Sequence, residues 1–462
     1  MSTRPAWAEI DLAALAANYR ELAARLRPGV AMIASVKANA YGHGAVEVAR
    51  VLSSEGAEWL ATGTFEEAVA IREAGISTPI LLFAGPSPAA LADMLGRGFE
   101  PTVHDLASAR AVSEAATAPA SVWIEVDAGL GRLGVPIEEA EAFVRTVGGL
   151  PNVAVRGLYT HLPFVDGDGS DWAAARLPAF RELVGALTRA GLAPEITQAL
   201  SSAGILAGLE DGCTAVCPGH VLFGLPPASP ETVDFSAFLP VLRAVKTRLL
   251  QVTPYTTARA AGVGGRIQLP AGAVTGVAAF AGGLAAAWWG RGGRTVPATL
   301  ARNVGLALAV VALGYLALWW SSHALQAPLG FQVLVAALGA SGALVLGRFG
   351  TLAAVAVLAA AGVADRLPEA SLSRRHLLPL LAAAAVLVGG RRVPVRGVSL
   401  EHTTLDLTGV DAAVGDEVVV LGTQGGETIS AVEIASWQGA SADDVVLAFD
   451  RKLPRDYLET AS

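Results

Sequence analysis

Eight apolar runs alternate with helical patterns over about the first 225 residues, and this alternation limits the folds that the chain can adopt. Each run is rich in apolar or β-branched residues and ends at turn residues, as buried strands do; the runs are 30–36, 59–64, 80–84, 100–104, 122–127, 155–161, 196–202 and 215–223. Between them, apolar residues recur at three- and four-residue spacing, which is typical of helices, for example in 45–54, 66–74 and 137–147. The pattern predicts an α/β fold, a (β/α)8 TIM barrel with its chemistry at the carboxyl ends of the strands.

A lysine stands at the end of the first apolar run. Lys37 is followed by the glycine-punctuated turn 38–44, so the strand delivers one amine to the edge of the predicted barrel. Desolvation lowers the pKa of a lysine, and a neutral amine is a nucleophile toward carbonyl compounds. Lys37 is therefore a candidate for forming a Schiff base. The alternative is a lysine that only extends its ammonium group into solvent, and the spacing leaves both open.

Two separated motifs add a resemblance. Residues 5–12 read PAWAEIDL, Asn18 follows, and residues 35–44 read SVKANAYGHG. In this order they resemble the start of the alanine racemase family, fold-type III enzymes that depend on pyridoxal 5'-phosphate. The resemblance extends through the barrel and implies that Lys37 carries the cofactor and acts as a catalytic base. It also implies cofactor contacts from four further residues at strand ends: Tyr41 and Ser202 at the phosphate, Arg132 near the phenolic oxygen, and His161 near the ring.

These contacts have structural alternatives. Tyr41 and His161 could be packing residues, and Ser202 could be a helix cap. Residues 129–134 also fit G-x-G-x-x-G, a pattern of dinucleotide-binding sites. That pattern belongs to open, doubly wound sheets, whereas this chain predicts a barrel. The resemblance instead places 129–134 in the loop that follows the fifth strand, with Asp127 at the strand's end.

The chain departs from the family at four single positions and in one segment, 400–402, which reads LEH where the family has the Met-Asp-Gln that meets the substrate carboxylate. Cys217 stands where the family has the arginine that faces the pyridine nitrogen, and Val277 replaces the tyrosine that is the second catalytic base. Glu125 replaces a lysine and Asp443 a phosphate-contacting tyrosine. A racemase transfers protons on both faces of a carbanion, so losing one base predicts impaired two-base racemisation. Tyr255 is the only tyrosine near the missing base in sequence.

A long apolar segment interrupts the predicted β-rich C-terminal domain. The runs 303–320 and 327–347 are each long enough to cross a hydrocarbon core of about 30 Å as a helix. The runs 350–364 and 376–390 are shorter but free of charge, whereas 274–289 is not expected to cross. Four crossings would keep the barrel cytoplasmic in a multi-pass protein of the cell membrane. A buried helical bundle is the alternative.

The sequence therefore predicts four parts. They are the barrel (1–228), the first part of a β-rich domain (229–275), a transmembrane helical insert (276–391) and the second part of the β-rich domain (392–462). The net charge of −8 offers no basic patch for nucleic acid. Neither a disulfide framework nor a zinc site is indicated by Cys213 and Cys217.

Two functions remain open at this point. The first is a membrane-anchored amino-acid racemase of the alanine racemase type, which interconverts L- and D-alanine for cell-wall precursors. The second is a catalytically degenerate membrane protein that binds pyridoxal phosphate and has a binding or regulatory role. The resemblance implies a small amino acid as the ligand, and the apolar runs of the insert predict membrane lipid as a further partner. It also implies a dimer, either of identical chains or with a racemase paralogue whose catalytic residues are intact.

Overall fold

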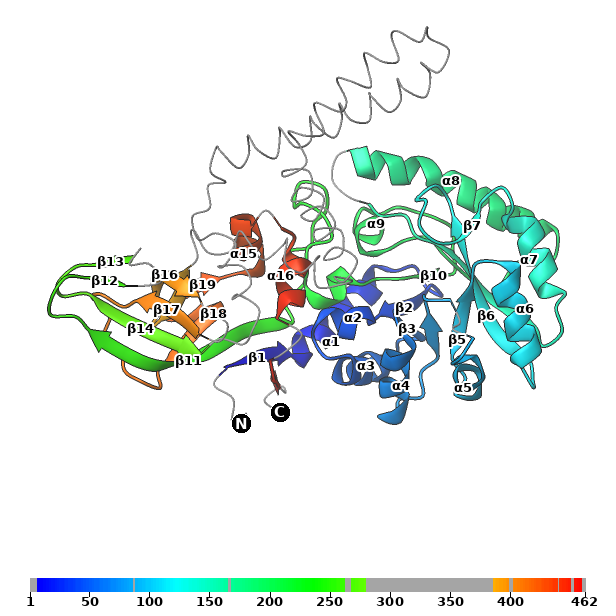
Figure 1. The fold of residues 1–462 in the computed structure, drawn as a ribbon. Helices are drawn as coiled ribbons and strands as arrows, with labels where there is room; N and C mark the ends of the chain where they lie inside the picture. Colours follow the sequence, from blue (N-terminus) through cyan, green and yellow to red (C-terminus); the bar gives the residue numbers. More distant parts are fainter. Residues whose placement is uncertain are drawn as a thin grey trace, which may run out of the picture. The chain divides into compact units, whose positions relative to one another are not determined.

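The structure is a computed structural model of the chain (Figure 1). It describes residues 6–85, 88–164, 168–261, 267–279, 385–398, 402–438, 440–449 and 453–458. These residues belong to one compact unit, in which a parallel barrel and a second, mostly antiparallel sheet are joined.

Eight parallel strands close into the predicted barrel. In chain order they are β2 (Ala31–Ser35), β3 (Trp59–Thr62), β4 (Ile80–Leu82), β5 (Glu100–Val103), β6 (Ala120–Asp127), β8 (Val153–Thr160), β9 (Ile196–Gln198) and β10 (Ala215–Val216). Each strand pairs with the next, and β10 pairs with β2, so the sheet has no free edge. The short strand β7 (Val135–Pro136) adds to β6 outside this ring.

Helices cover the outside of the barrel strands (Figure 1). They are α1 (Leu12–Arg25), α3 (Ala45–Ser54), α4 (Phe65–Glu73), α5 (Leu91–Gly96), α6 (Leu106–Ala115), α7 (Ala140–Gly148) and α8 (Asp168–Arg189). Two short segments, α2 (Lys37–Tyr41) and α9 (Ser202–Leu206), follow the carboxyl ends of β2 and β9. The barrel interior is filled by inward side chains from successive strands, with Trp123 fully buried at its centre. Trp123 satisfies its indole N–H by donating to Glu100 Oε2 at 2.6 Å.

The barrel prediction is confirmed, but two predicted elements differ from the structure. The eighth apolar run, 215–223, forms a strand only at Ala215–Val216; Pro218 and Gly219 then end the strand, and a 3-10 turn follows at His220–Phe223. The first element of the chain is also outside the barrel. Strand β1 (Ala6–Asp11) pairs with strands of the second sheet, although the sequence placed residues 1–228 in the barrel.

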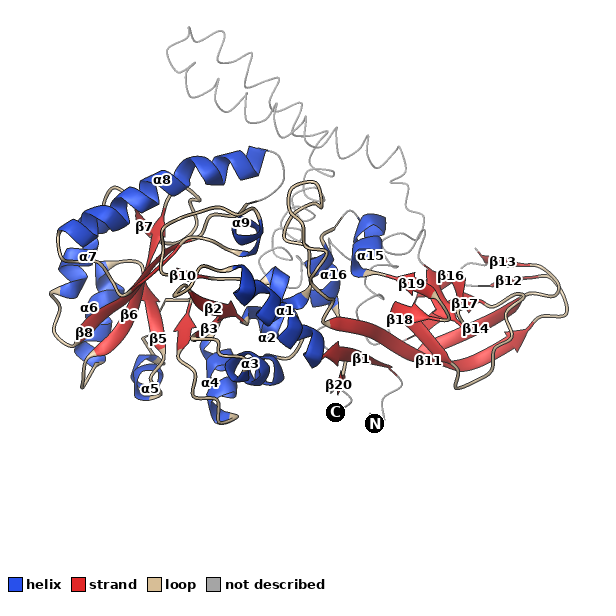
Figure 2. Cartoon of the chain, turned by 180° about the vertical axis from the view of Figure 1, so that it is seen from behind, coloured by secondary structure: helices blue, strands red, loops and turns tan. Residues whose placement is uncertain are grey.

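The second sheet contains the start and the end of the chain (Figure 2). Its strand order is β19-β18-β15-β16-β17-β14-β11-β1-β20, and β18 also pairs with β11, so that six of the strands form a closed ring. Its strands are β1, β11 (Leu242–Pro254), β14 (Val274–Ala279), β15 (Ala385–Val388), β16 (Arg391–Val398), β17 (His402–Asp406), β18 (Glu417–Gln424), β19 (Glu427–Ile429) and β20 (Arg455–Leu458). A separate pair, β12 (Arg259–Ala261) and β13 (Ile267–Leu269), and two helices, α15 (Ala431–Gln438) and α16 (Ala442–Ala448), complete this part.

The apolar insert falls mostly on residues that the structure does not describe. The predicted spans 303–320, 327–347 and 350–364 lie outside the described residues. The fourth predicted span, 376–390, is wrong in its last part, because β15 pairs there with β16 and β18. The run 274–289, which was not expected to cross the membrane, begins with strand β14. Among the residues that are described, no helix is both long and apolar enough to cross a bilayer.

Candidate active site

One cavity brings together all five side chains that the sequence singled out as site residues. It has a volume of about 470 Å³, and its lining includes Lys37, Tyr41, Arg132, His161 and Ser202. All five follow the carboxyl ends of barrel strands, where a parallel barrel places its loops. The volume is that of a cavity that takes a small organic cofactor together with a small substrate.

Lys37 lies two residues after the last residue of β2 and is half-buried in this cavity. Its Nζ lies 5.9 Å from the ring centroids of both Tyr41 and Phe83. Burial lowers the pKa of the Lys37 ammonium below its usual value, and the positive charge of Arg132 lowers it further. This is the environment that favours a nucleophilic amine, as the position of Lys37 predicted.

The chain after Lys37 makes a left-handed turn. The φ angles of residues 38 to 41 lie between 52° and 54° although none of them is glycine, and such a conformation costs about 1–2 kcal/mol per residue. Contacts from distant segments hold the turn. Glu67 Oε1 accepts the N–H of Asn39 at 2.7 Å, and the Arg455 guanidinium donates twice to Gly42 O, at 3.0 and 2.8 Å.

Ser202 and Tyr41 place two hydroxyl groups beside Gly219 at one edge of the cavity. Ser202 Oγ accepts the N–H groups of Gly219 and Val221 at 3.0 and 3.3 Å, so its own O–H is left to donate. Tyr41 packs against Gly219 so closely that a Cβ on Gly219 would collide with Tyr41 Oη. Burial raises the pKa of the Tyr41 phenol to about 12. A glycine loop with two hydroxyl donors fits an anionic group such as a phosphate, and this edge therefore fits the cofactor that the resemblance implies.

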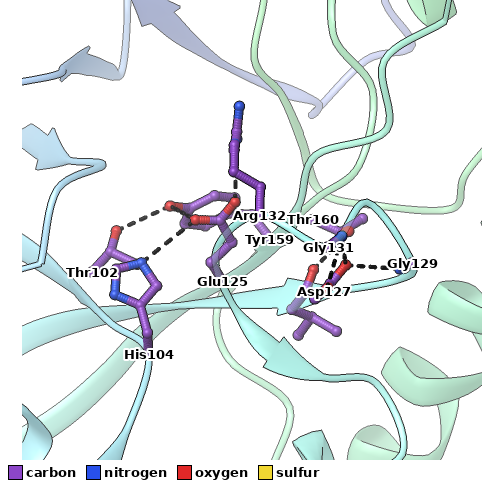
Figure 3. Close-up of polar contacts among 10 residues, drawn as sticks. Thr102, His104, Glu125, Asp127, Gly129, Gly131, Arg132, Tyr159 and Thr160 are labelled. Atoms are coloured by element: carbon purple, nitrogen blue, oxygen red, sulfur yellow. Dashed lines mark hydrogen bonds and ion pairs between the residues drawn. The ribbon is translucent and has the colours of Figure 1, made fainter. Parts of the chain in front are cut away.

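Arg132 is tied to the barrel interior through Glu125 (Figure 3). Glu125 is buried on β6, and its Oε1 lies 3.5 Å from Arg132 Nη2. Tyr159 donates to Glu125 Oε2 at 3.2 Å, and His104 Nε2 lies 3.6 Å from the same oxygen. Thr102 Oγ1 lies 3.1 Å from Tyr159 Oη. The carboxylate that replaces the family's lysine thus connects the loop cation to a polar network inside the barrel.

The glycine-rich loop that carries Arg132 is shaped by Asp127. Asp127 Oδ1 accepts the N–H groups of Gly129 and Gly131 at 2.8 and 3.1 Å, as Figure 3 shows. The loop then enters strand β7 and not the N-terminus of a helix. A dinucleotide site needs its glycine loop to open a helix, so the structure does not fit the dinucleotide alternative.

His161 and Cys217, at the positions that the resemblance places beside the cofactor ring, are two neutral side chains of the cavity. Burial lowers the pKa of His161 to about 4, and the positive charges of Arg132 and Lys37 act in the same direction. Burial raises the pKa of the Cys217 thiol to about 12. At neutral pH the site therefore presents an imidazole and a thiol without charge.

Val277, at the position of the family's second base, lies in the second sheet and not on a strand of the barrel. Val277 sits on β14, paired with Gln251 and Thr404, and Tyr255 follows β11. Within the described part of the chain, neither residue is among those that line the cavity. Residues 400 and 401, which align with the family's substrate-carboxylate segment, are not described, whereas His402 lies exposed on β17. Within the described residues, the cavity therefore contains Lys37 but neither of the two residues considered for the family's second base.

The structure adds lining residues to which the sequence assigned no role. They are Phe83, Phe164, Tyr159, Gln198 and His220. Tyr159 and Gln198 lie on barrel strands, so strand alternation could have placed them inside. His220 contacts Asp443 through an ion pair of 3.4 Å between Nε2 and Oδ2. Because 223 positions separate these two residues, no local pattern could indicate their contact.

Comparisons with known families agree with both halves of the chain. The family model "Alanine racemase, N-terminal domain" matches residues 10–227, and "Alanine racemase, C-terminal domain" matches residues 351–457. The chain is 30% identical over 476 residues to the alanine racemase of Desulfosudis oleivorans, covering 100% of this chain and 99% of the relative. It is 31% identical over 476 residues to that of Sorangium cellulosum, covering 99% of this chain and 100% of the relative.

Solved structures show the same fold. The alanine racemase of Bacillus anthracis with bound L-Ala-P has a TM-score of 0.73 at 21% identity and covers 100% of this chain and 97% of that one. The enzyme of Streptomyces coelicolor has a TM-score of 0.70 at 24% identity and covers 98% of each chain. The cavity, the family models and the full-length relatives lead to one assignment. The chain belongs to the alanine racemase family, whose members are pyridoxal phosphate-dependent isomerases.

Proposed function

We propose that this protein interconverts the L and D forms of alanine. The observation that supports this proposal most directly is that Lys37 and the four predicted cofactor contacts line one cavity. The substrate is assigned from the relatives, which bear the name alanine racemase. The cavity of about 470 Å³ has room for the cofactor and an amino acid with a small side chain.

Separate residues of this chain would bind the cofactor and transfer the proton. Pyridoxal phosphate, when bound, supplies an electron sink that acidifies the Cα–H of an amino acid. Lys37 Nζ, whose pKa burial lowers, can take and return that proton on one face. Ser202 and Tyr41 would hold the phosphate, and Arg132, steadied by Glu125, would orient the ring. Cys217 supplies no charge to the cavity, because burial keeps its thiol protonated and a protonated thiol is neutral.

Neither residue considered for the second base provides proton delivery to the opposite face from within the described part of this chain. Val277 has no titratable group, and neither it nor Tyr255 is among the residues that line the cavity. We propose that a second subunit supplies this group, either another copy of the chain or a racemase paralogue with an intact tyrosine. A single exchange-competent lysine then serves one face, and the partner serves the other.

The experiment that tests the function separates exchange from inversion. The purified chain is incubated with pyridoxal phosphate and L-alanine in deuterium oxide, and Cα deuteration and D-alanine are both followed. Deuteration that disappears in Lys37→Ala supports Lys37 as a base, and Lys246→Ala, whose ammonium pairs with Glu9 at 2.9 Å, is the matched control. Inversion only after addition of a racemase paralogue that keeps its tyrosine but whose own Schiff-base lysine is replaced supports the mixed dimer, and full inversion by the chain alone sinks it. No deuteration by a cofactor-loaded chain overturns the proposed activity.

We also propose that the apolar insert anchors the enzyme in the cell membrane with the barrel on the cytoplasmic side. The support is the charge-free character of runs such as 303–320 and 327–347. Both ends of the insert, β14 and β15, lie in the same sheet, so the chain must return to the side from which it left. We expect the protein to stay in membranes washed with alkaline carbonate. A variant in which a glycine–serine linker replaces 280–384 should be released, and a wild-type chain found in the wash would contradict anchoring.

A further inference from the structure

His220 lies on the same edge of the cavity as the hydroxyl donors. It begins the 3-10 turn that follows Gly219, and it lines the cavity together with Tyr41 and Ser202. Its ring packs edge-to-face on the Tyr41 ring, with centroids 5.3 Å apart. The imidazole is therefore fixed beside the two residues that the resemblance assigns to the cofactor phosphate.

Asp443 holds the other side of this imidazole. It lies in the first turn of α16, and its Oδ2 is 3.4 Å from His220 Nε2. The side chains of His220 and Asp443 are 36% and 32% exposed, so both are partly withdrawn from water. The bond from His220 is the main reason why the pKa of Asp443 falls to about 2. The carboxylate is thus ionised at neutral pH, and it accepts from the histidine ring that contacts it.

The charge balance of this edge points to a role for the pair. Ser202 carries no charge, and burial keeps the Tyr41 phenol neutral by raising its pKa to about 12. Arg132, the guanidinium of the cavity, is already paired with Glu125. A phosphate ester carries between one and two negative charges and binds best to charged donors. Without a cation on His220, Asp443 would place an uncompensated negative charge at the edge where the phosphate binds.

We propose that His220 is a further phosphate-binding residue of this enzyme, which binds the phosphate as an imidazolium, and that Asp443 is the positioning residue that orients its imidazole. Protonated imidazole has an N–H on each nitrogen, so it can donate to Asp443 from Nε2 and to a phosphate oxygen from Nδ1. The proposal rests on pyridoxal phosphate as the cofactor, which the family assignment gives. The pair would take the place of the family's phosphate-contacting tyrosine, which this chain lacks.

The test compares two ligands that differ only in the phosphate. Equilibrium binding of pyridoxal phosphate and of pyridoxal to the cofactor-free full chain is measured at neutral pH by absorption and fluorescence. We expect His220→Asn to weaken pyridoxal phosphate about tenfold and to leave pyridoxal within twofold. His220→Lys, which restores a cation, should recover most of the loss. Asp443→Asn should weaken pyridoxal phosphate about threefold, because the imidazole loses its carboxylate partner.

The controls separate this role from general damage. Asp444→Asn removes the same charge from the neighbouring residue of α16, which caps the helix through Ser441, and should not discriminate between the ligands. Equal losses for both ligands in His220→Asn, or no loss for either, would overturn the proposal, as would tighter binding of pyridoxal phosphate by Asp443→Asn. A wild-type chain that binds neither ligand would overturn the cofactor assignment and the proposal with it.

Discussion

Arg132 Nη2 lies 3.5 Å from Glu125 Oε1, and this pair joins a glycine-rich loop to a buried strand of the barrel. The Arg132 side chain is 53% exposed, whereas that of Glu125 is 4% exposed. The carboxylate is held in turn by the Tyr159 hydroxyl. The position of Arg132 at the cavity is therefore set from inside the barrel and not by the loop alone.

Removing the negative charge of this pair should reduce turnover. In Glu125→Gln the amide still accepts from Tyr159 but no longer attracts Arg132. We expect kcat/KM to fall about tenfold, which corresponds to about 1.4 kcal/mol of transition-state stabilisation. Glu141→Gln breaks an exposed helix-surface pair with Arg145 and is the matched control for a lost charge. Unchanged kinetics in Glu125→Gln would show that Arg132 does not depend on the pair.

The end of the chain should support the left-handed turn that follows Lys37. Arg455 donates twice to Gly42 O, and hydrogen bonds from charged groups contribute about 1.5–3 kcal/mol. We expect Arg455→Ala to lower the free energy of unfolding by about 2 kcal/mol and to weaken cofactor binding. Arg243→Ala, which removes an exposed pair with Asp11, should cost less than about 1 kcal/mol. Denaturant titration and cofactor binding measure both effects, and equal behaviour of the two variants would contradict the role of Arg455.

Two glycines offer a matched test of the barrel's packing. A Cβ on Gly157 would overlap the buried Trp123 ring, whereas a Cβ on Gly148, at the end of α7, would meet nothing within 4 Å. Overfilling a packed core costs about 1–3 kcal/mol, and glycine-to-alanine changes in open helical positions stabilise by about 0.4–1 kcal/mol. We expect Gly157→Ala to lower the midpoint of thermal unfolding and Gly148→Ala to leave it unchanged or raise it slightly. A higher unfolding midpoint in Gly157→Ala than in Gly148→Ala would mean that the side chains around Trp123 can rearrange to accept the added methyl group.

Acid should destabilise the enzyme through a buried histidine. Burial lowers the pKa of His43 to about 4, from the ordinary value of 6.5 for histidine. The unfolded chain therefore binds this proton first, and stability is fully present above pH 6.5 and falls as the pH drops toward 4. The loss from one such group is about 3 kcal/mol at most. The free energy of unfolding, measured from pH 7 to pH 4, should fall less steeply in His43→Asn; an identical slope would exclude His43 as a source.

The sequence by itself determined the barrel and the place of its chemistry. Alternating apolar runs and helical spacing depend on neighbours a few residues apart, so the eight strands and the position of Lys37 at the end of β2 could be read locally. The strand ends also predicted that Tyr41, Arg132, His161 and Ser202 would meet, because a closed barrel brings the carboxyl ends of its strands to one face. The departures at Glu125, Cys217 and Val277 were visible as residue types but not as contacts.

Only the tertiary structure decided what those residues touch. Strand β1 joins the second sheet because its partners, β11 and β20, come from the middle and the end of the chain. Arg455 reaches Gly42 across 413 positions, and His220 reaches Asp443 across 223. No periodicity of the chain encodes such pairs, because they depend on how the barrel and the second sheet pack within one unit. Local patterns thus determined the strands of the barrel and the position of Lys37. Long-range packing determined which charged groups lie near Lys37 and which contacts hold the left-handed turn that follows it.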